Sequence, residues 1–157
     1  MLKNVTVSNL FGSLPEEYVR DEFERGLKRN YNLWALASLD ELIRRGQSGF
    51  IVCALESAFD KCQILEGSSL LVSLAETLKE DCEGDKYLRS YGASLLNGEF
   101  LSPSAWAEKR SKELDAGHDP AAAREIRFWI RICHRDHNLS CESDMLDDLN
   151  MEQCELH

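Results

Sequence analysis

DPAAAREIRFWIRICHRDH, residues 119–137, contains the longest and clearest helical pattern of this chain. Its apolar residues recur at steps of three and four, the period of one face of an α-helix: Ile126, Trp129, Ile130 and Cys133. Asp119-Pro120 supplies a start, because proline is tolerated in the first turn of a helix. We predict one long amphipathic helix from Pro120 to about His137, with its apolar face in a core.

The opposite side of this helix is basic. Four arginines follow one another along it: Arg124, Arg127, Arg131 and Arg135. Phe128 and Ile132 flank this arginine stripe, so we expect another element to cover it. Residues 141–157 contain six acidic residues and no lysine or arginine. We expect this acidic tail to fold back and pair with the stripe. The alternative is that the tail engages a basic partner.

Helix start and stop signals recur along the rest of the chain. Ser13-Leu14-Pro15-Glu16 and Ser38-Leu39-Asp40-Glu41 are capping boxes. Other starts and stops are, in chain order, Asn30, Gly46, Gly67-Ser68, Gly84-Asp85, Asn97-Gly98, Ser102-Pro103 and Gly117. The fold class is therefore all-α, with seven to eight short helices in antiparallel hairpins that form a bundle or a short helical-repeat array.

The size and composition of the chain suit one domain. It has 157 residues, of which 43% are hydrophobic, enough for a packed core. We predict a single helical domain over 1–157, with 1–12 as a loose start and 138–157 as an acidic C-terminal helix or tail. No apolar run approaches the roughly 18 residues of a membrane span, and the start lacks a secretory signal. We expect a cytoplasmic protein whose six dispersed cysteines are reduced.

The strongest global signal is the net charge of -10. It disfavours direct binding of nucleic acid, because phosphates need concentrated lysine and arginine. It favours encounter with a basic protein. We predict two groups of partner-binding residues, one in the middle of the chain and one in the tail. They are Glu80, Asp81, Glu83 and Asp85, and Glu142, Asp144, Asp147 and Asp148.

Two stretches of the chain resemble each other at an offset of about 31 to 33 residues. The first contains Ile64-Leu65-Glu66-Gly67, Ala75-Glu76 and Glu83-Gly84, and the second contains Leu95-Leu96-Asn97-Gly98, Ala107-Glu108 and Ala116-Gly117. The second stretch, from Tyr91-Gly92 through Trp106 to Ala121, resembles tetratricopeptide-like helical repeats, whose period is 34 residues.

This resemblance covers about residues 50–123 and no family is assigned to the whole chain. The first stretch departs from the family because it lacks a regular alanine at the packing positions. The resemblance implies a stacked helical scaffold that binds a peptide or a protein. On that hypothesis we expect an exposed groove lined by Tyr87, Tyr91 and Trp106.

Cys133, His137 and Cys141 are the candidate metal ligands. They are spaced by four, so an uninterrupted helix would place all three on one face. Zinc accepts thiolate and imidazole ligands but requires four at tetrahedral geometry, and a break is predicted at Asn138 to Ser140. We therefore assign no metal and no cofactor, and keep a metal-binding protein as an alternative.

No catalytic motif is assembled in the sequence, so we expect a protein that is not an enzyme. The leading hypothesis is a non-catalytic protein-binding module. Its most concrete form is an immunity or antitoxin-like inhibitor that masks a basic partner such as a toxin nuclease. The alternatives are a helical-repeat chaperone or adaptor that binds a peptide segment, and the metal-binding protein.

Overall fold

The computed structural model of the chain describes residues 11–140, and within this range all regular structure is α-helical. The helices are α2 (Glu16–Arg29), α3 (Asn32–Arg44), α4 (Ser48–Asp60), α5 (Ser69–Asp81), α6 (Lys86–Leu96), α7 (Pro103–Ala116) and α8 (Pro120–Ser140). The all-α prediction is confirmed.

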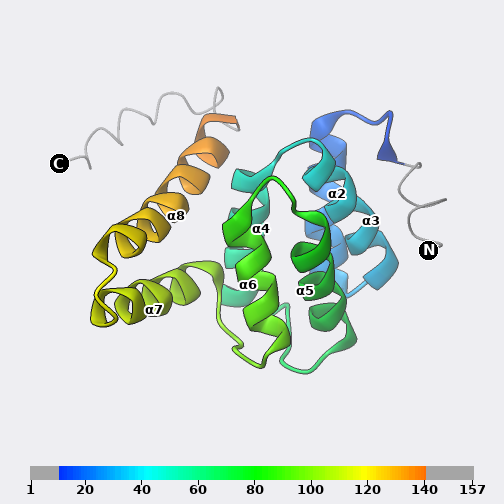
Figure 1. Ribbon diagram of the computed structural model, residues 1–157. Helices are drawn as coiled ribbons and strands as arrows, with labels where there is room; N and C mark the ends of the chain where they lie inside the picture. The colour runs from blue at the N-terminus through cyan, green and yellow to red at the C-terminus, as the bar shows by residue number, and fades with distance from the viewer. Residues whose placement is uncertain (1–10, 141–157) are drawn as a thin grey trace.

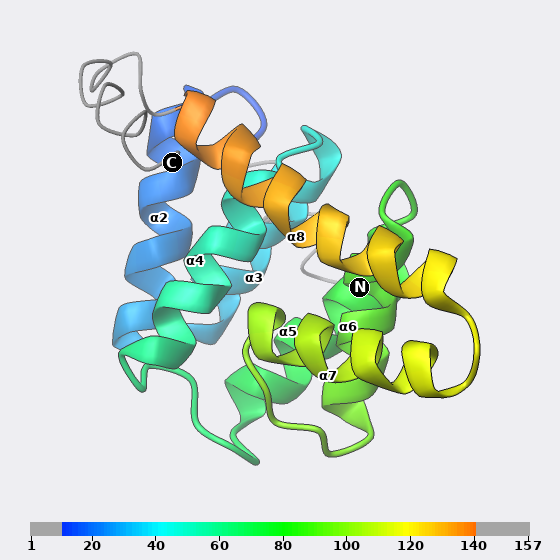
Figure 2. The same ribbon diagram turned by 90° about the vertical axis from the view of Figure 1, so that its left-hand side faces the viewer.

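The helices pack as three hairpins with one helix between them. α2 pairs with α3, α5 with α6, and α7 with α8, each across a short connection. α4 lies between the first and last hairpins and packs against α8, while α3 packs against α5 (Figures 1 and 2). The contact between α4 and α8 therefore joins the first part of the chain to the last hairpin, and the contact between α3 and α5 joins the first hairpin to the second.

Several predicted start residues cap their helices. The Ser68 hydroxyl accepts a hydrogen bond from the backbone N–H of Leu71 at the start of α5. The Asp85 carboxylate accepts from two backbone N–H groups at the start of α6, and Ser102 caps α7 in the same way as Ser68. Asn30, at the end of α2, adopts the left-handed conformation that terminates a helix.

Three boundary predictions were wrong. Ser13 does not cap α2, whose N-cap is Pro15 without a side-chain hydrogen bond. Ser38 lies in the middle of α3, where its hydroxyl donates to the carbonyls of Trp34 and Ala35 instead of accepting from a backbone N–H at a helix start. No break occurs after His137, because α8 continues to Ser140.

Glycines allow the closest helix contacts. A Cβ on Gly26 of α2 would lie 2.9 Å from the backbone of Ala35 in α3. On Gly92 of α6 it would lie 2.7 Å from the Ala75 carbonyl oxygen in α5. On Gly49 of α4 it would lie 2.6 Å from a carbonyl oxygen of α8. Each approach is too close for any side chain, so glycine sets the helix separation there.

A chain of aromatic rings fills the space between α6, α7 and α8. Tyr91 packs on Trp106, Trp106 on Trp129, and Trp129 on Tyr87, with centroid distances of 5.5 to 6.1 Å. The buried Tyr91 hydroxyl donates to the Leu101 carbonyl at 2.6 Å. Tyr91 and Trp106 are therefore core residues, and the prediction that they line an exposed groove was wrong.

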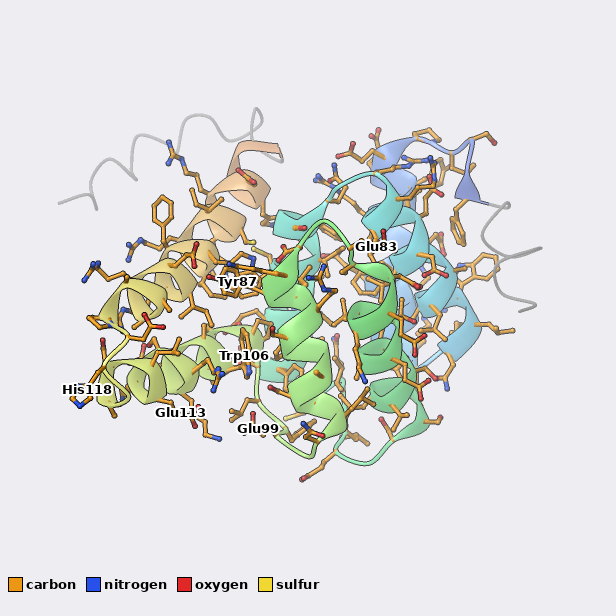
Figure 3. All side chains as sticks on the ribbon, viewed as in Figure 1. Glu83, Tyr87, Glu99, Trp106, Glu113 and His118 are labelled. Atoms are coloured by element: carbon orange, nitrogen blue, oxygen red, sulfur yellow. The ribbon has the colours of Figure 1, made fainter. Side chains whose placement is uncertain are left out.

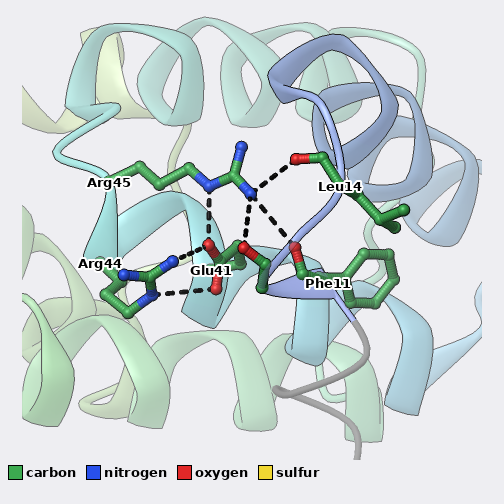
Figure 4. A network of polar contacts seen from close by, with 6 residues as sticks. Phe11, Leu14, Glu41, Arg44 and Arg45 are labelled. Carbon is green, nitrogen blue, oxygen red and sulfur yellow. Dashed lines mark hydrogen bonds and ion pairs between the residues drawn. The ribbon is translucent and has the colours of Figure 1, made fainter.

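A buried carboxylate ties the start of the described chain to α3 (Figure 4). Glu41 is 2% exposed and pairs with Arg44 and Arg45. Burial alone would raise the pKa of Glu41, but hydrogen bonds from both arginines outweigh it and lower the pKa. Arg45 also donates to the carbonyls of Phe11 and Leu14, at 3.1 and 2.8 Å.

Candidate interaction surfaces

The predicted acidic residues of the middle of the chain surround the turn between α5 and α6. Glu80, Asp81 and Glu83 are exposed there, and Figure 3 shows Glu83 far from Glu99 and Glu113 beside α7. The buried Cys82 thiol lies beneath them. Burial, with Asp85 and Asp81 nearby, raises its pKa to about 12, so it stays protonated at neutral pH.

Asp85 differs from its exposed neighbours Glu80 and Glu83 because its carboxylate stabilises the fold. One carboxylate oxygen accepts from the backbone N–H groups of Tyr87 and Leu88, both at 3.0 Å. The other accepts from the indole N–H of Trp129 in α8 at 3.1 Å. We define the acidic turn patch as Glu80, Asp81 and Glu83. Asp85 is left out of the patch because its carboxylate caps α6 and bonds to Trp129.

Eight carboxylates elsewhere in residues 11–137 pair with the chain's own lysines and arginines. The pairs are Glu16 with Arg20, Glu22 with Arg25, Glu41 with Arg44 and Arg45, Glu99 with Lys109, Glu108 with Lys112, Glu113 with Arg110, Asp115 with Arg127, and Glu125 with Lys86. Glu80 and Glu83 form no such ion pair among residues 11–137. Glu80 and Glu83 thus retain their negative charge within the described part of the chain.

The arginine stripe lies on the outer side of α8. Ile126, Trp129 and Cys133 are buried, which confirms the predicted apolar face. Of the arginines in the stripe, Arg124, Arg131 and Arg135 are exposed, whereas Arg127 is half-buried and reaches Asp115 of α7 at 3.4 Å. Phe128 is 54% exposed between them. The residues expected to cover the stripe, including Glu142, Asp144, Asp147 and Asp148, lie outside the described range.

The candidate metal ligands do not form a site in the part of the chain that the structure describes. Cys133 and His137 lie on α8, and Cys141 is outside that part. Burial raises the pKa of the Cys133 thiol to about 12, which opposes the thiolate that zinc requires. Burial, with Arg20 and His134 nearby, lowers the pKa of His137, whose ring packs against Phe50. No group of three or more ligands is present among the described residues.

Two hollows meet at the turn between α2 and α3, a region that the sequence did not single out. The first, of about 450 Å³, lies between the ends of α2 and α4 and is lined by Arg25, Lys28, Arg29 and Lys61, among others. The second, of about 890 Å³, has a largely apolar lining that includes Tyr31, Leu33 and Trp34. Arg25 and Arg29 belong to both hollows.

Sequence reasoning missed these hollows because their residues come together only in the folded chain. Lys61 follows α4 and is more than thirty residues from Arg29. The available signal was local: Arg25, Lys28 and Arg29 cluster on α2, immediately before the apolar run that begins at Tyr31. Basic residues in the last turn of a helix are common, so this signal alone does not indicate a site.

The two turns lie at opposite ends of the molecule. The start of α3 meets the start of α5, where Asn32 Nδ2 donates to Ser69 Oγ at 2.9 Å. α5 then runs away from the α2–α3 turn for 13 residues. At about 1.5 Å per residue its far end is about 20 Å from that contact. The acidic turn patch and the hollows are therefore separate surfaces.

Within residues 11–140, no helix combines the length and the apolar character needed to cross a bilayer. Comparison with protein-family models, with curated proteins and with solved structures returned no match for the chain.

Proposed function

We propose that the protein is a non-catalytic protein-binding module that uses the acidic turn patch to engage a basic surface of another protein. In its most concrete form it is an inhibitor that covers a basic cleft, such as the substrate cleft of a toxin nuclease. The supporting observation is that Glu80 and Glu83 form no ion pair among the described residues, whereas eight other carboxylates pair with lysine or arginine of the chain.

Unpaired surface charges act on a partner in two ways. They attract an oppositely charged protein over about one Debye length, roughly 8 Å at physiological salt, and so accelerate encounter. They also form ion pairs across the interface, which paired carboxylates can do only by giving up their existing partner. The patch is carried on a hairpin whose turn is fixed by Asp85, so the carboxylates start from a defined arrangement.

The test is a pull-down from the native host with the full chain as bait, at low and high salt. We compare the wild type with Glu80→Lys/Glu83→Lys and with Glu108→Lys/Glu113→Lys, which changes net charge equally on α7. We expect the wild type to recover a stoichiometric basic partner at low salt and to lose it at high salt. The patch variant should recover at least tenfold less of this partner. Equal recovery by both double variants, or recovery that salt does not affect, would contradict the proposal.

Neither alternative is favoured by a specific observation. The adaptor hypothesis needed Tyr91 and Trp106 at an exposed groove, and both are buried. The metal hypothesis needed a ligand cluster, and residues 11–140 contain none of three or more ligands. The acidic patch therefore remains the basis of the proposed function.

A further inference from the structure

The hollows at the α2–α3 turn combine positive charge with exposed apolar side chains. Arg25, Lys28, Arg29 and Lys61 line the first hollow with only two carboxylates, Asp21 and Glu24. Tyr31 and Leu33 line the second and are 54% and 60% exposed. In a chain with a net charge of -10, this is a local excess of cations beside apolar surface.

Helix stability explains part of this arrangement. Lys28 and Arg29 lie in the last turn of α2, where cations interact favourably with the helix dipole. The same explanation applies to Lys61, the C-cap residue of α4, but it does not extend to Arg25, one turn earlier in α2. Nor does it explain why two large apolar side chains, Tyr31 and Leu33, are exposed next to the cations.

The cations that line the hollows also make few ion pairs within the described part of the chain. Arg25 pairs with Glu22 at 3.6 Å, a long contact with an already engaged carboxylate, because Glu22 also accepts from the indole N–H of Trp34 at 2.5 Å. Lys28 and Arg29 make no ion pair within the described part of the chain. These side chains can therefore bind an external anion without breaking strong internal contacts.

We infer that these hollows bind an acidic segment of a partner protein in which an aromatic or aliphatic residue adjoins two or more carboxylates. Arg25 and Arg29 lie one helical turn apart and present guanidinium groups, which bind carboxylates with two parallel hydrogen bonds. The apolar residue of the segment packs on Tyr31, Leu33 and Trp34. This inference goes beyond the proposed function, because the surface, its charge and its ligand all differ from those of the acidic turn patch.

The experiment measures binding of fluorescein-labelled peptides to the full chain by anisotropy. The probe is fluoresceinyl-Asp-Glu-Phe-Asp-Glu-Leu-amide, labelled at its N-terminus, and its neutral counterpart has Asn and Gln in place of Asp and Glu. We expect saturable binding of the acidic probe that weakens with rising salt and is at least tenfold tighter than binding of the neutral peptide. Arg25→Glu/Arg29→Glu should weaken binding at least tenfold, and Leu33→Ser about threefold.

Lys112→Glu is the control for charge reversal at another surface, since Lys112 is an exposed cation on α7 far from the hollows along the chain. It should leave the affinity unchanged, and circular dichroism should show that all variants remain folded. The inference fails if the acidic and neutral peptides bind equally, or if the Lys112 variant loses as much affinity as the arginine variant. It also fails if a single-stranded oligonucleotide binds this surface more tightly than the acidic probe.

Discussion

The α5–α6 turn and the α2–α3 turn carry opposite charge at opposite ends of the molecule, and they relate to the fold in different ways. At the acidic turn, one carboxylate of the group, Asp85, holds α6 and α8 in place. At the basic turn, the cations line hollows and Arg29 forms no ion pair among the described residues. The comparison teaches that a charge is available to a partner only where the fold has not already engaged it.

The largest expected effects come from the glycines that close the two hairpins. Gly92→Ala in α6 and Gly26→Ala in α2 each place a Cβ within 3 Å of the partner helix. We expect each to lower the free energy of unfolding by up to about 3 kcal/mol, because the helices must separate. Urea denaturation measures this. Gly84→Ala, whose Cβ meets nothing within 4 Å, is the control and should change stability by less than about 0.5 kcal/mol.

If Gly92→Ala proves neutral, the α5–α6 hairpin is looser than its contacts indicate. The acidic turn patch would then not be presented in a defined arrangement. Gly26→Ala tests the basic turn in the same way, so the two variants compare the rigidity of the two hairpins directly.

The next expected effect distinguishes Asp85, whose carboxylate stabilises the fold, from Glu83, whose carboxylate is exposed at the same turn. Asp85→Ala removes the cap of α6 and leaves the Trp129 indole N–H without its acceptor. We expect a loss of about 2 kcal/mol in stability, the sum of a lost cap and a lost part-buried hydrogen bond. Glu83→Ala should cost less than about 0.5 kcal/mol. Similar costs for both in thermal or urea unfolding would refute the distinction.

The sequence predicted the helices well where pattern and caps agree. The apolar face of α8 and the caps Ser68, Asp85 and Ser102 followed from spacing and residue type alone. Ser38 was assigned wrongly because Ser followed three residues later by Glu is also compatible with a helix interior. In α3 the Ser38 hydroxyl donates to a carbonyl of the preceding turn, and Glu41 accepts hydrogen bonds from Arg44 and Arg45.

Predicting the interaction surfaces required knowledge that the sequence alone does not contain. Whether Asp85 is available to a partner depends on Trp129, which lies more than forty residues away in the chain. The hollows depend on Lys61 reaching the end of α2. Charge and composition could indicate an acidic protein, but only the packed helices decide which charges remain unpaired.

A moderate effect is expected where the start of the described chain supports the basic turn. Arg45 bonds to the carbonyls of Phe11 and Leu14, and Phe11 packs against Trp34 at a centroid distance of 5.2 Å. We expect Arg45→Ala to cost about 1.5 kcal/mol in stability and to weaken acidic-peptide binding about threefold, since Trp34 lines the second hollow. Binding of the basic partner should be unchanged. Equal losses at both surfaces would show that the two ends are coupled.

The smallest expected effect concerns Glu24, a carboxylate inside the basic hollow. Loss of hydration there and the nearby Asp21 raise the pKa of Glu24, while Lys61 and Arg20 oppose this. The folded chain therefore binds this proton more tightly than the unfolded chain, and the associated stabilisation is present at acid pH and lost as pH rises through the raised pKa. At neutral pH the ionised carboxylate repels an acidic ligand.

Glu24→Gln should thus tighten acidic-peptide binding about twofold at pH 7, with under about 0.5 kcal/mol change in stability. The ratio of variant to wild-type affinity, which cancels titration of the peptide itself, should approach one as pH falls and Glu24 becomes protonated. A ratio that stays constant from pH 7 to pH 4 would mean that Glu24 does not face the ligand, and would restrict the anion site to Arg25, Arg29 and the second hollow.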